Sequence, residues 1–287
     1  MKQNILDVRN LTVRFGGIVA LDKVNFGVEK GSITALIGPN GAGKTTVFNC
    51  LTGFYKSTEG SIDFGVEGKR INIEKVLGEP FELSDCLKPS SFVHKLYYKT
   101  LGGSHLVARA GLARTFQNIR LFDEMTAIEN LMVAQHMNAR SGLISGLLNL
   151  PGYRASEQEH IDRAYQWLDI IDLTKDANRL ASELPYGHQR RLEIARAMCI
   201  DPKMICLDEP AAGLNPAETE DLARLIQRLR DEYHVTVFVI EHDMALVMDI
   251  SDQIVVLNYG QVIAHGEPEK IKNDPTVLAA YLGTEES

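Results

Sequence analysis

The sequence has few cysteines, and their spacing argues against both disulfides and metal sites. Among 287 residues there are four, at Cys50, Cys86, Cys199 and Cys206, all far apart in the chain. Three of them have apolar neighbours, which is typical of buried thiols. We therefore expect free cysteines in a reducing cytoplasm and no metal-ligand cluster.

Long hydrophobic runs and an excess of positive charge are also missing. The longest strongly apolar runs, 204–207 and 235–240, fall far short of the roughly 20 residues that a membrane helix needs. The first residues lead straight into an alternating pattern, so no signal peptide is expected. The net charge of −8 argues against a broad nucleic-acid-binding face. A hydrophobic content of 45% predicts one large α/β domain or two smaller lobes, and argues against disorder.

A glycine-rich stretch at 37–46 is the strongest functional signal. It reads I-G-P-N-G-A-G-K-T-T and contains the pattern G-x-x-x-x-G-K-T, which cradles phosphate groups. Its glycines allow backbone N–H groups to turn toward phosphate oxygens, Lys44 would reach the β- and γ-phosphates, and Thr45 would ligate Mg²⁺. The strand-like run before it and the helical run after it favour this interpretation over an accidental turn. The candidate phosphate-binding residues are Gly38, Pro39, Asn40, Gly41, Ala42, Gly43, Lys44, Thr45 and Thr46.

Two later strands end in polar residues. The run 204–207 leads into Asp208 and Glu209, and the run 235–240 leads into Glu241 and His242. Parallel strands bring such residues to one edge of a sheet, where α/β proteins bind ligands. Asp208 would hold Mg²⁺, and Glu209 would orient or deprotonate an attacking water. Each motif alone is also compatible with a solvated acidic turn or a structural histidine.

The remaining pattern predicts a β-rich entrance and a helical lobe. Alternation at 5–15, 19–28 and 60–64 indicates strands, and 254–265 indicates a closing hairpin before a short helix at 277–282. Helical periodicity dominates 127–166, with a short helix or loop at 141–152.

The connection over 68–106 is too long for a plain loop, and 90–101 is its best helical segment. That segment is read as a solvated accessory helix, with contact to a membrane subunit or lipid as the alternative. Phe15 precedes a double glycine, and the pattern alone favours a core aromatic over a ring that stacks on adenine.

The segment 184–197, L-P-Y-G-H-Q-R-R-L-E-I-A-R-A, resembles the signature of ATP-binding cassette (ABC) ATPases, usually written L-S-G-G-Q. The phosphate loop, Gln117, 204–209 and His242 stand in the family's order, so the resemblance covers nearly the whole chain. It implies a P-loop NTPase of ABC type, with a mostly parallel central sheet, an antiparallel β entrance and a helical subdomain. Residues 1–287 would form one ABC ATPase domain. The expected parts are a RecA-like core with β subdomain at about 1–117 and 186–287, a helical subdomain at about 118–185 and an accessory insertion at about 68–106.

The resemblance also implies the roles of individual residues. Two cassettes would pair head to tail, so that each ATP lies between one phosphate loop and the other cassette's signature. Phe15 would stack on adenine, which reverses the interpretation from pattern alone. Gln117 would contact the metal site and sense the transport partner. The expected catalytic residues are Glu209, His242 and Gln117. The expected metal ligands are Thr45, Gln117 and Asp208. The residues expected to contact the nucleotide of the partner cassette are Tyr186 and Gly187.

The chain departs from the family pattern at several positions. Pro185 replaces the usual Ser, Tyr186 the first Gly and His188 the Gln, while Asn215 stands for Asp in the dimer-coupling loop. The missing Ser hydroxyl predicts a weakened contact with the partner's γ-phosphate. Pro is compatible with the start of a helix, so the Gly187 N–H remains available.

Within the family, several strings are similar to those of branched-chain amino acid importers. They are R-T-F-Q at 114–117, Y-G before the arginine pair, E-P-A-A-G-L-N-P at 209–216 and A-Y-L-G at 280–283. This implies ATP and Mg²⁺ as cofactors, and a peripheral location on the cytoplasmic face of the membrane. The implied partners are a second ABC ATPase subunit (a second copy or a paralogue), transmembrane permease subunits and, indirectly, a periplasmic or extracellular substrate-binding protein.

Other functions stay open at this point. Importers of urea or short amides have similar ATPases. A non-transport cassette acting on ribosomes or DNA is disfavoured by the single copy of each motif and the acidic composition. A GTPase or kinase is disfavoured because the sequence has no Asn-Lys-x-Asp motif and the Tyr-Gly helix would be unexplained.

Overall fold

The computed structural model describes residues 3–66, 69–78, 103–135 and 151–282. The helix expected at 90–101, nearly all of the stretch 141–152, and Cys86 lie outside the described residues. At the ends of the long connection the structure has β5, α2 and α4, as expected for a segment with structure of its own.

An antiparallel sheet forms the first layer and confirms the expected β entrance. Its order is β2-β1-β4-β5. Leu6 pairs with Val28 and Val8 with Phe26, and all four side chains are buried. The period-2 alternation of the sequence therefore places one face of this sheet in the core. Its strands are β1 (Asn4–Phe15), β2 (Ile18–Glu29), β4 (Glu59–Val66) and β5 (Lys69–Asn72).

A mostly parallel sheet forms the second layer, in the order β10-β9-β3-β8-β7-β6. Neighbours from β9 to β6 are parallel, and β10 is antiparallel to β9. The carboxyl ends of β3, β7 and β8 consequently lie at one edge. The strands are β3 (Ile33–Ile37), β6 (Leu112–Arg114), β7 (Met204–Asp208), β8 (Thr236–Ile240), β9 (Gln253–Asn258) and β10 (Gln261–Gly266).

Alternate residues of the parallel strands enter two different hydrophobic cores. Ile205 and Leu207 of β7 belong to one core, whereas Met204 and Cys206 belong to the other. Both faces of this sheet are therefore covered, which explains why its strands read as continuous apolar runs.

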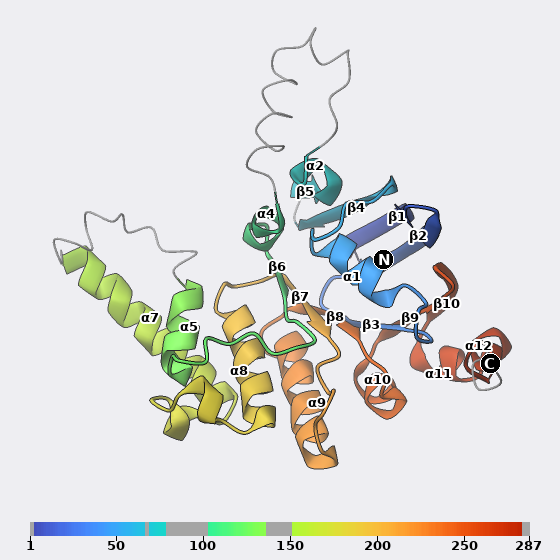
Figure 1. The fold of residues 1–287 in the computed structure, drawn as a ribbon. Coiled ribbons are helices and arrows are strands. Elements are labelled where there is room, and N and C mark those ends of the chain that lie inside the picture. The colour runs from blue at the N-terminus through green and yellow to red at the C-terminus, as the bar shows by residue number, and fades with distance from the viewer. Residues whose placement is uncertain (1–2, 67–68, 79–102, 136–150, 283–287) are drawn as a thin grey trace, which may run out of the picture.

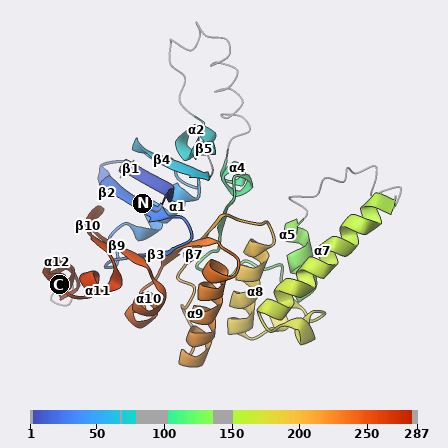
Figure 2. The same ribbon diagram turned by 180° about the vertical axis from the view of Figure 1, so that it is seen from behind.

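Helices cover each face of the parallel sheet. Figures 1 and 2 show α1 and the antiparallel sheet on one side, and α8, α9 and α10 on the other. Buried residues of α5, α7, α8 and α9 share a single core with the parallel sheet. The helices are α1 (Lys44–Leu51), α2 (Ile73–Val76), α4 (Ser104–Arg109), α5 (Ala127–Gln135), α7 (Pro151–Ile170), α8 (Tyr186–Met198), α9 (Pro216–Asp231), α10 (Met244–Ile250), α11 (Pro268–Lys272) and α12 (Pro275–Leu282), with 3₁₀ turns at Thr174–Asp176 and Ala181–Glu183.

The helical lobe lies at the edge of the molecule, beyond α8 (Figure 1). It contains α5 and α7, in agreement with the predicted helical periodicity. The boundaries at about 118 and 185 stay a prediction. Of the helices in the described part of the chain, none is long and apolar enough to cross a membrane.

Three cysteines confirm the expectation of buried free thiols. Cys50, Cys199 and Cys206 are buried and unpaired. Burial raises the pKa of each thiol to about 12. These side chains behave as small apolar core residues, and the thiolate needed for nucleophilic chemistry does not form near neutral pH.

The loop before α9 contains a capping box. The Asn215 side chain accepts a hydrogen bond from the Glu218 N–H at 3.0 Å, and the Glu218 carboxylate accepts one from the Asn215 N–H at 3.0 Å. Asp at this position could accept the same bond, so the departure from the family pattern preserves the cap.

We expect Asn215→Ala to lower the free energy of unfolding by about 1 kcal/mol, because the Ala side chain cannot accept the Glu218 N–H. Asn215→Asp, the matched control, should leave the free energy unchanged or slightly higher, since a carboxylate also favours a helix N-terminus. Urea unfolding followed by circular dichroism measures both. Equal stability of the Ala variant and the parent would contradict the capping role.

Candidate functional site

The phosphate loop joins β3 to α1 and depends on glycine backbone conformations. Gly38, Gly41 and Gly43 have φ angles of 151°, 79° and 103°. A Cβ on Gly38 would lie 2.0 Å from the Leu257 carbonyl oxygen. The loop backbone therefore passes against β9 at a distance that only glycine permits.

Lys44 lies inside this loop. Its Nζ donates hydrogen bonds to the carbonyl oxygens of Gly38 at 2.7 Å and Pro39 at 3.0 Å. Burial lowers the pKa of the ammonium, and the nearby Glu209 carboxylate opposes that shift. The loop therefore contains a cation, and the hydrogen bonds of Lys44 hold the two ends of the loop together.

A cleft of about 480 Å³ opens beside the loop. It brings together the loop, Glu209 and His242, because β7 and β8 end at the same edge as β3. Its lining is Ile18, Val19, Ala20, Asn40, Gly41, Ala42, Gly43, Lys44, Thr45, Thr46, Glu209, His242, Tyr259 and Gly260.

Glu209 is held between two polar side chains. Gln117 Nε2 donates to Glu209 Oε2 at 2.7 Å, and His242 Nε2 lies 2.6 Å from Glu209 Oε1. Glu209 has a φ of 46°, a left-handed conformation that is costly for a residue with a side chain. Its N–H donates to the Ile240 carbonyl at 2.9 Å, which secures this strand end against β8. Gln117 and His242, both predicted from the sequence, therefore contact the carboxylate of the third predicted residue, Glu209.

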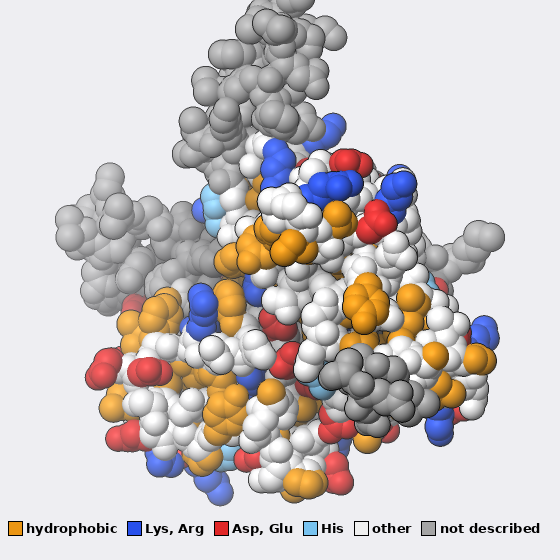
Figure 3. Space-filling view, turned by 45° about the vertical axis from the view of Figure 1, so that its right-hand side comes forward, with side chains coloured by type: hydrophobic (Ala, Val, Ile, Leu, Met, Phe, Trp, Pro, Cys, Tyr) orange, Lys and Arg blue, Asp and Glu red, His pale blue; other side chains and the backbone are white. Residues whose placement is uncertain are grey.

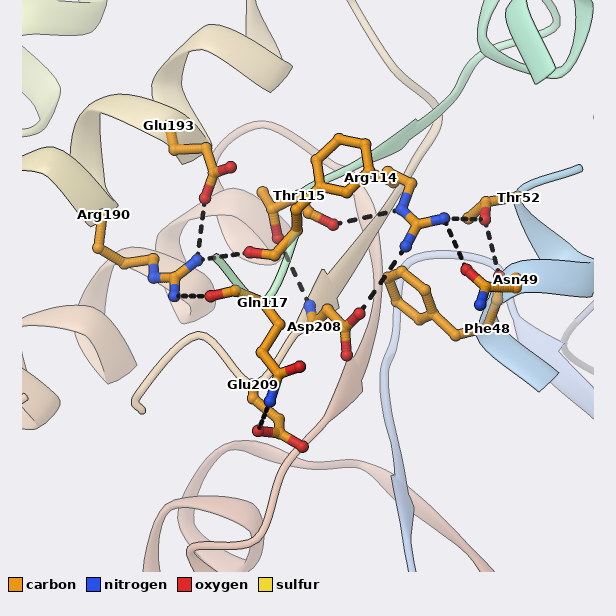
Figure 4. A network of polar contacts seen from close by, with 11 residues as sticks. Phe48, Asn49, Thr52, Arg114, Thr115, Gln117, Arg190, Glu193, Asp208 and Glu209 are labelled. Atoms are coloured by element: carbon orange, nitrogen blue, oxygen red, sulfur yellow. Dashed lines mark hydrogen bonds and ion pairs between the residues drawn. The ribbon is translucent and has the colours of Figure 1, made fainter. Parts of the chain in front are cut away.

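Asp208 is nearly buried at the end of β7, with 6% of its surface exposed. Burial raises the pKa of its carboxyl group, and the positive charge of Arg114 opposes the shift. Arg114 Nη2 lies 3.8 Å from Asp208 Oδ2 (Figure 4). The Asp208 N–H donates to Thr115 Oγ1 at 3.4 Å, so the strand end is tied to the segment that leads to Gln117.

Arg114 links that segment to α1. Its Nη1 donates to Asn49 Oδ1 at 3.0 Å and to Thr52 Oγ1 at 2.9 Å. Its guanidinium carbon also lies 4.7, 4.4 and 4.5 Å from the ring centres of Phe48, Phe54 and Phe116. Burial lowers the pKa of the guanidinium, but aromatic faces, hydroxyl, amide and carboxylate partners compensate for the lost water.

Arg190 of α8 is fully buried and binds the same segment from the other side. It donates to the carbonyl oxygens of Phe116 at 2.8 Å and Gln117 at 2.7 Å, and to the Tyr186 hydroxyl at 3.3 Å. Glu193 balances its charge, with Nη1 2.9 Å from Glu193 Oε2. Figure 4 shows Arg190 pointing toward the segment with Thr115 and Gln117, whereas Arg114, at the end of β6, points the other way toward Asn49 and Thr52.

The signature segment begins α8, with Pro185 as the N-cap residue and no side-chain cap. Proline therefore fits the start of this helix, as expected. A Cβ on Gly187 would lie 2.6 Å from Glu218 Oε1, so a larger residue where α8 meets α9 would displace the Glu218 side chain. Tyr186 and Gly187 are not among the residues that line the cleft, and α8 packs on the sheet face opposite α1.

Phe15 is exposed over 48% of its surface, and its ring contacts Tyr55 edge-on at 5.4 Å. The interpretation of Phe15 as a core aromatic, based on pattern alone, is wrong. The ring does not line the cleft, but its cross-strand partner Ile18 does.

Sequence reasoning missed several residues of the site. Ile18, Val19 and Tyr259 line the cleft although nothing in their pattern distinguishes them from strand or turn residues. The tight interactions of Arg190 were also missed. The i, i+3 spacing of Arg190 and Glu193 is compatible with an ion pair on one helix face, but the same spacing occurs on exposed helices and does not indicate burial.

The donor set is compatible with Mg²⁺. Thr45 has an exposed hydroxyl, Asp208 a carboxylate, and Gln117 an amide oxygen that remains after its nitrogen binds Glu209. Oxygen atoms of this kind are the ligands Mg²⁺ prefers. Among the described residues, no group of three or more His, Cys, Asp or Glu side chains could hold another metal.

Comparisons with known proteins agree with this geometry. A family model described as ABC transporter matches residues 21–212, and one described as branched-chain amino acid ATP-binding cassette transporter matches residues 261–287. The chain is 50% identical over 283 residues to the high-affinity branched-chain amino acid transport ATP-binding protein BraF of Pseudomonas aeruginosa, with 99% of each chain covered. It is 49% identical to LivG of Escherichia coli, a protein of the same description, over the same length and coverage.

A solved structure gives the same result for the fold. An ATP-binding cassette of an ABC transporter in its ADP conformation matches with a TM-score of 0.73 and 32% identity, covering 98% of this chain and 99% of that one. The predicted fold class is confirmed. The chain therefore belongs to the ABC transporter family and is one of its ATP-binding cassettes.

Proposed function

We propose that this chain binds ATP and Mg²⁺ in the cleft beside the phosphate loop and hydrolyses ATP in a head-to-tail pair of cassettes. The hydrolysis drives uptake of branched-chain amino acids through a membrane permease. The observation that carries the proposal is the Glu209 carboxylate, held between Gln117 and His242 at the same cleft as Lys44.

The residues of the cleft divide the chemistry between them. Lys44 exchanges its loop carbonyl partners for the β- and γ-phosphates, and the loop N–H groups bind the same oxygens. Glu209 orients the attacking water and accepts its proton, while His242 contacts the γ-phosphate. Phe15 stacks on the adenine ring from the edge of the cleft.

Thr45, Asp208 and Gln117 would hold Mg²⁺. When bound, the ion neutralises part of the negative charge that the triphosphate accumulates during transfer. Asp208 is suited to this role because its carboxyl group lies at the end of β7 beside the cleft residue Glu209, and burial, which raises its pKa, leaves it with little water. A cation near the carboxylate would stabilise its ionised form.

The signature segment acts on the nucleotide of a second cassette. The first-turn N–H groups of α8, including that of Gly187, have no side-chain cap and can bind an anion. They lie on the sheet face opposite α1, which supports a site completed by a partner. That partner is a second copy or a paralogue.

The proposed role in membrane transport rests on the similarity to the proteins BraF and LivG. BraF and LivG are described as branched-chain amino acid transport proteins and match almost the entire chain. The chain would lie on the cytoplasmic face of the membrane, bound to permease subunits that receive substrate from a periplasmic or extracellular binding protein. An importer of urea or short amides is the competing assignment.

Replacing Glu209 by Gln should lower ATP turnover by about 10²- to 10⁴-fold, because the amide cannot accept the proton of the attacking water. ATP binding should persist, so an ATP-bound dimer should accumulate in gel filtration. Glu220→Gln on the exposed face of α9 is the matched control and should hydrolyse ATP at the parent rate. Parent-like turnover of the Glu209 variant would remove this residue from catalysis.

Replacing Pro185 by Ser should strengthen pairing of the cassettes by adding a hydroxyl donor for the partner's γ-phosphate. We expect the ATP concentration for half-maximal dimerisation, measured in the Glu209→Gln background, to fall by about three- to tenfold. Pro185→Ala removes the ring without adding a donor and serves as the control. An identical ATP dependence of the Ser, Ala and Pro forms would show that the missing hydroxyl does not limit pairing.

Purification of the tagged chain from membranes should recover permease subunits together with a second ATPase. Cells that carry the Lys44→Ala variant should then lose uptake of radiolabelled leucine, because the phosphates lose their cation. Uptake of urea and of acetamide is measured in parallel. Loss of urea or amide uptake with normal leucine uptake would replace the amino acid assignment.

A further inference from the structure

Tyr259 occupies a position that folding alone does not explain. It is 85% exposed in the turn between β9 and β10, and it lines the cleft of the phosphate loop. Its φ of 44° is left-handed, a conformation that glycine and asparagine adopt at much lower cost than an aromatic residue. An exposed ring on a strained backbone contributes little to the stability of the core, so we look for a role of this side chain in binding.

The turn is held tightly against the phosphate loop. The Gly260 N–H donates to the Ala42 carbonyl at 2.9 Å, and the Gly260 carbonyl accepts from the Asp22 N–H at 2.9 Å. A Cβ on Gly260 would lie 2.6 Å from the Ala20 carbonyl oxygen. Tyr259 is therefore carried at a fixed place between the phosphate loop and β2, with its side chain free of the core.

The strand order shows which end of a nucleotide would lie there. Glu209 and His242 follow β7 and β8, on one side of β3, so the γ-phosphate end lies on that side. β9 is the neighbour of β3 on the other side, and Tyr259 follows it directly. The turn between β1 and β2 opens at this same end, where Ile18 lines the cleft (Figure 1).

The exposed apolar side chains at this end form a small rim. Ile18 is 72% exposed and Val19 and Tyr259 also reach the surface. On the face of the molecule in Figure 3, the described residues form separate groups of hydrophobic side chains with acidic ones between them. A rim of this size suits a small planar molecule at the cleft more than a protein partner.

We propose that Tyr259 is a second aromatic contact for the nucleoside of ATP, on a different strand connection from Phe15. The proposal rests on the proposed function, because the phosphate loop must hold the triphosphate. The ring of Tyr259 covers the ribose and the adjoining base edge against Ile18 and Val19, and it contributes to nucleoside affinity without touching the phosphates.

The test compares a ligand that has a nucleoside with one that lacks it. ADP and tripolyphosphate are titrated with Mg²⁺ into the full chain by calorimetry, with tripolyphosphate measured by competition where its own heat is small. The variants are Tyr259→Ala, Tyr259→Phe, Lys44→Ala and, as matched control, Tyr165→Ala on α7, where another tyrosine is exposed away from the cleft. Thermal unfolding of each variant is recorded beside the titration.

We expect Tyr259→Ala to weaken ADP binding by about 5- to 30-fold, as for other base contacts with aromatic rings. Tripolyphosphate should bind as to the parent, and Tyr259→Phe should bind ADP within about twofold of it because the ring is retained. Tyr165→Ala should match the parent for both ligands.

Two results would overturn the proposal while leaving the proposed function intact. One is unchanged ADP affinity in Tyr259→Ala, and the other is equal weakening of ADP and tripolyphosphate, which would mean that Tyr259 supports the loop. A different result would overturn the proposed function itself. It is a Lys44→Ala variant that binds ADP and tripolyphosphate as well as the parent does.

Discussion

A buried ion pair on α8, between Arg190 and Glu193, fixes the relation between the two halves of this molecule. Both side chains are almost completely shielded from water. Burying a charge is costly unless every donor and acceptor finds a partner. Arg190 meets most of this demand through its Nη atoms, which donate to the carbonyl oxygens of Phe116 and Gln117, while its buried Nε has no hydrogen-bond partner among the described residues. Glu193 accepts the Arg120 N–H at 3.2 Å. The signature helix and the Gln117 segment are consequently held as one unit.

Arg114 holds the same segment from the opposite side. It joins β6 to α1 through Asn49 and Thr52, and it faces Asp208 across 3.8 Å. Gln117 thus lies between an arginine of the phosphate-loop side and an arginine of the signature side. Any displacement of α8 relative to α1 has to be absorbed by the short stretch of backbone between these two anchors, and the Gln117 contact with Glu209 is at its end.

The sequence was sufficient to predict the strands and helices whose positions depend on local hydrophobic pattern. Alternation in β1 indicated a strand of the β-rich entrance, and the apolar runs of β7 and β8 indicated strands that end in polar residues. The carboxyl ends of parallel strands then placed Glu209 and His242 together. Side-chain contacts between distant segments were beyond this reasoning. From its pattern alone, Arg190 is expected on the surface of a charged helix and Phe15 in the core. Both expectations are wrong because the local pattern carries no information about how the surrounding loops pack.

Lys44 also changes the energetics of ligand capture. Its ammonium already has two carbonyl partners in the loop, at 2.7 and 3.0 Å. An incoming phosphate must exchange those hydrogen bonds instead of adding new ones, so the gain from this lysine is a difference between two bonded states. The preformed loop loses little conformational entropy when it is occupied. Discrimination among phosphorylated solutes of similar charge is therefore left largely to whatever the ligand carries beyond its phosphates.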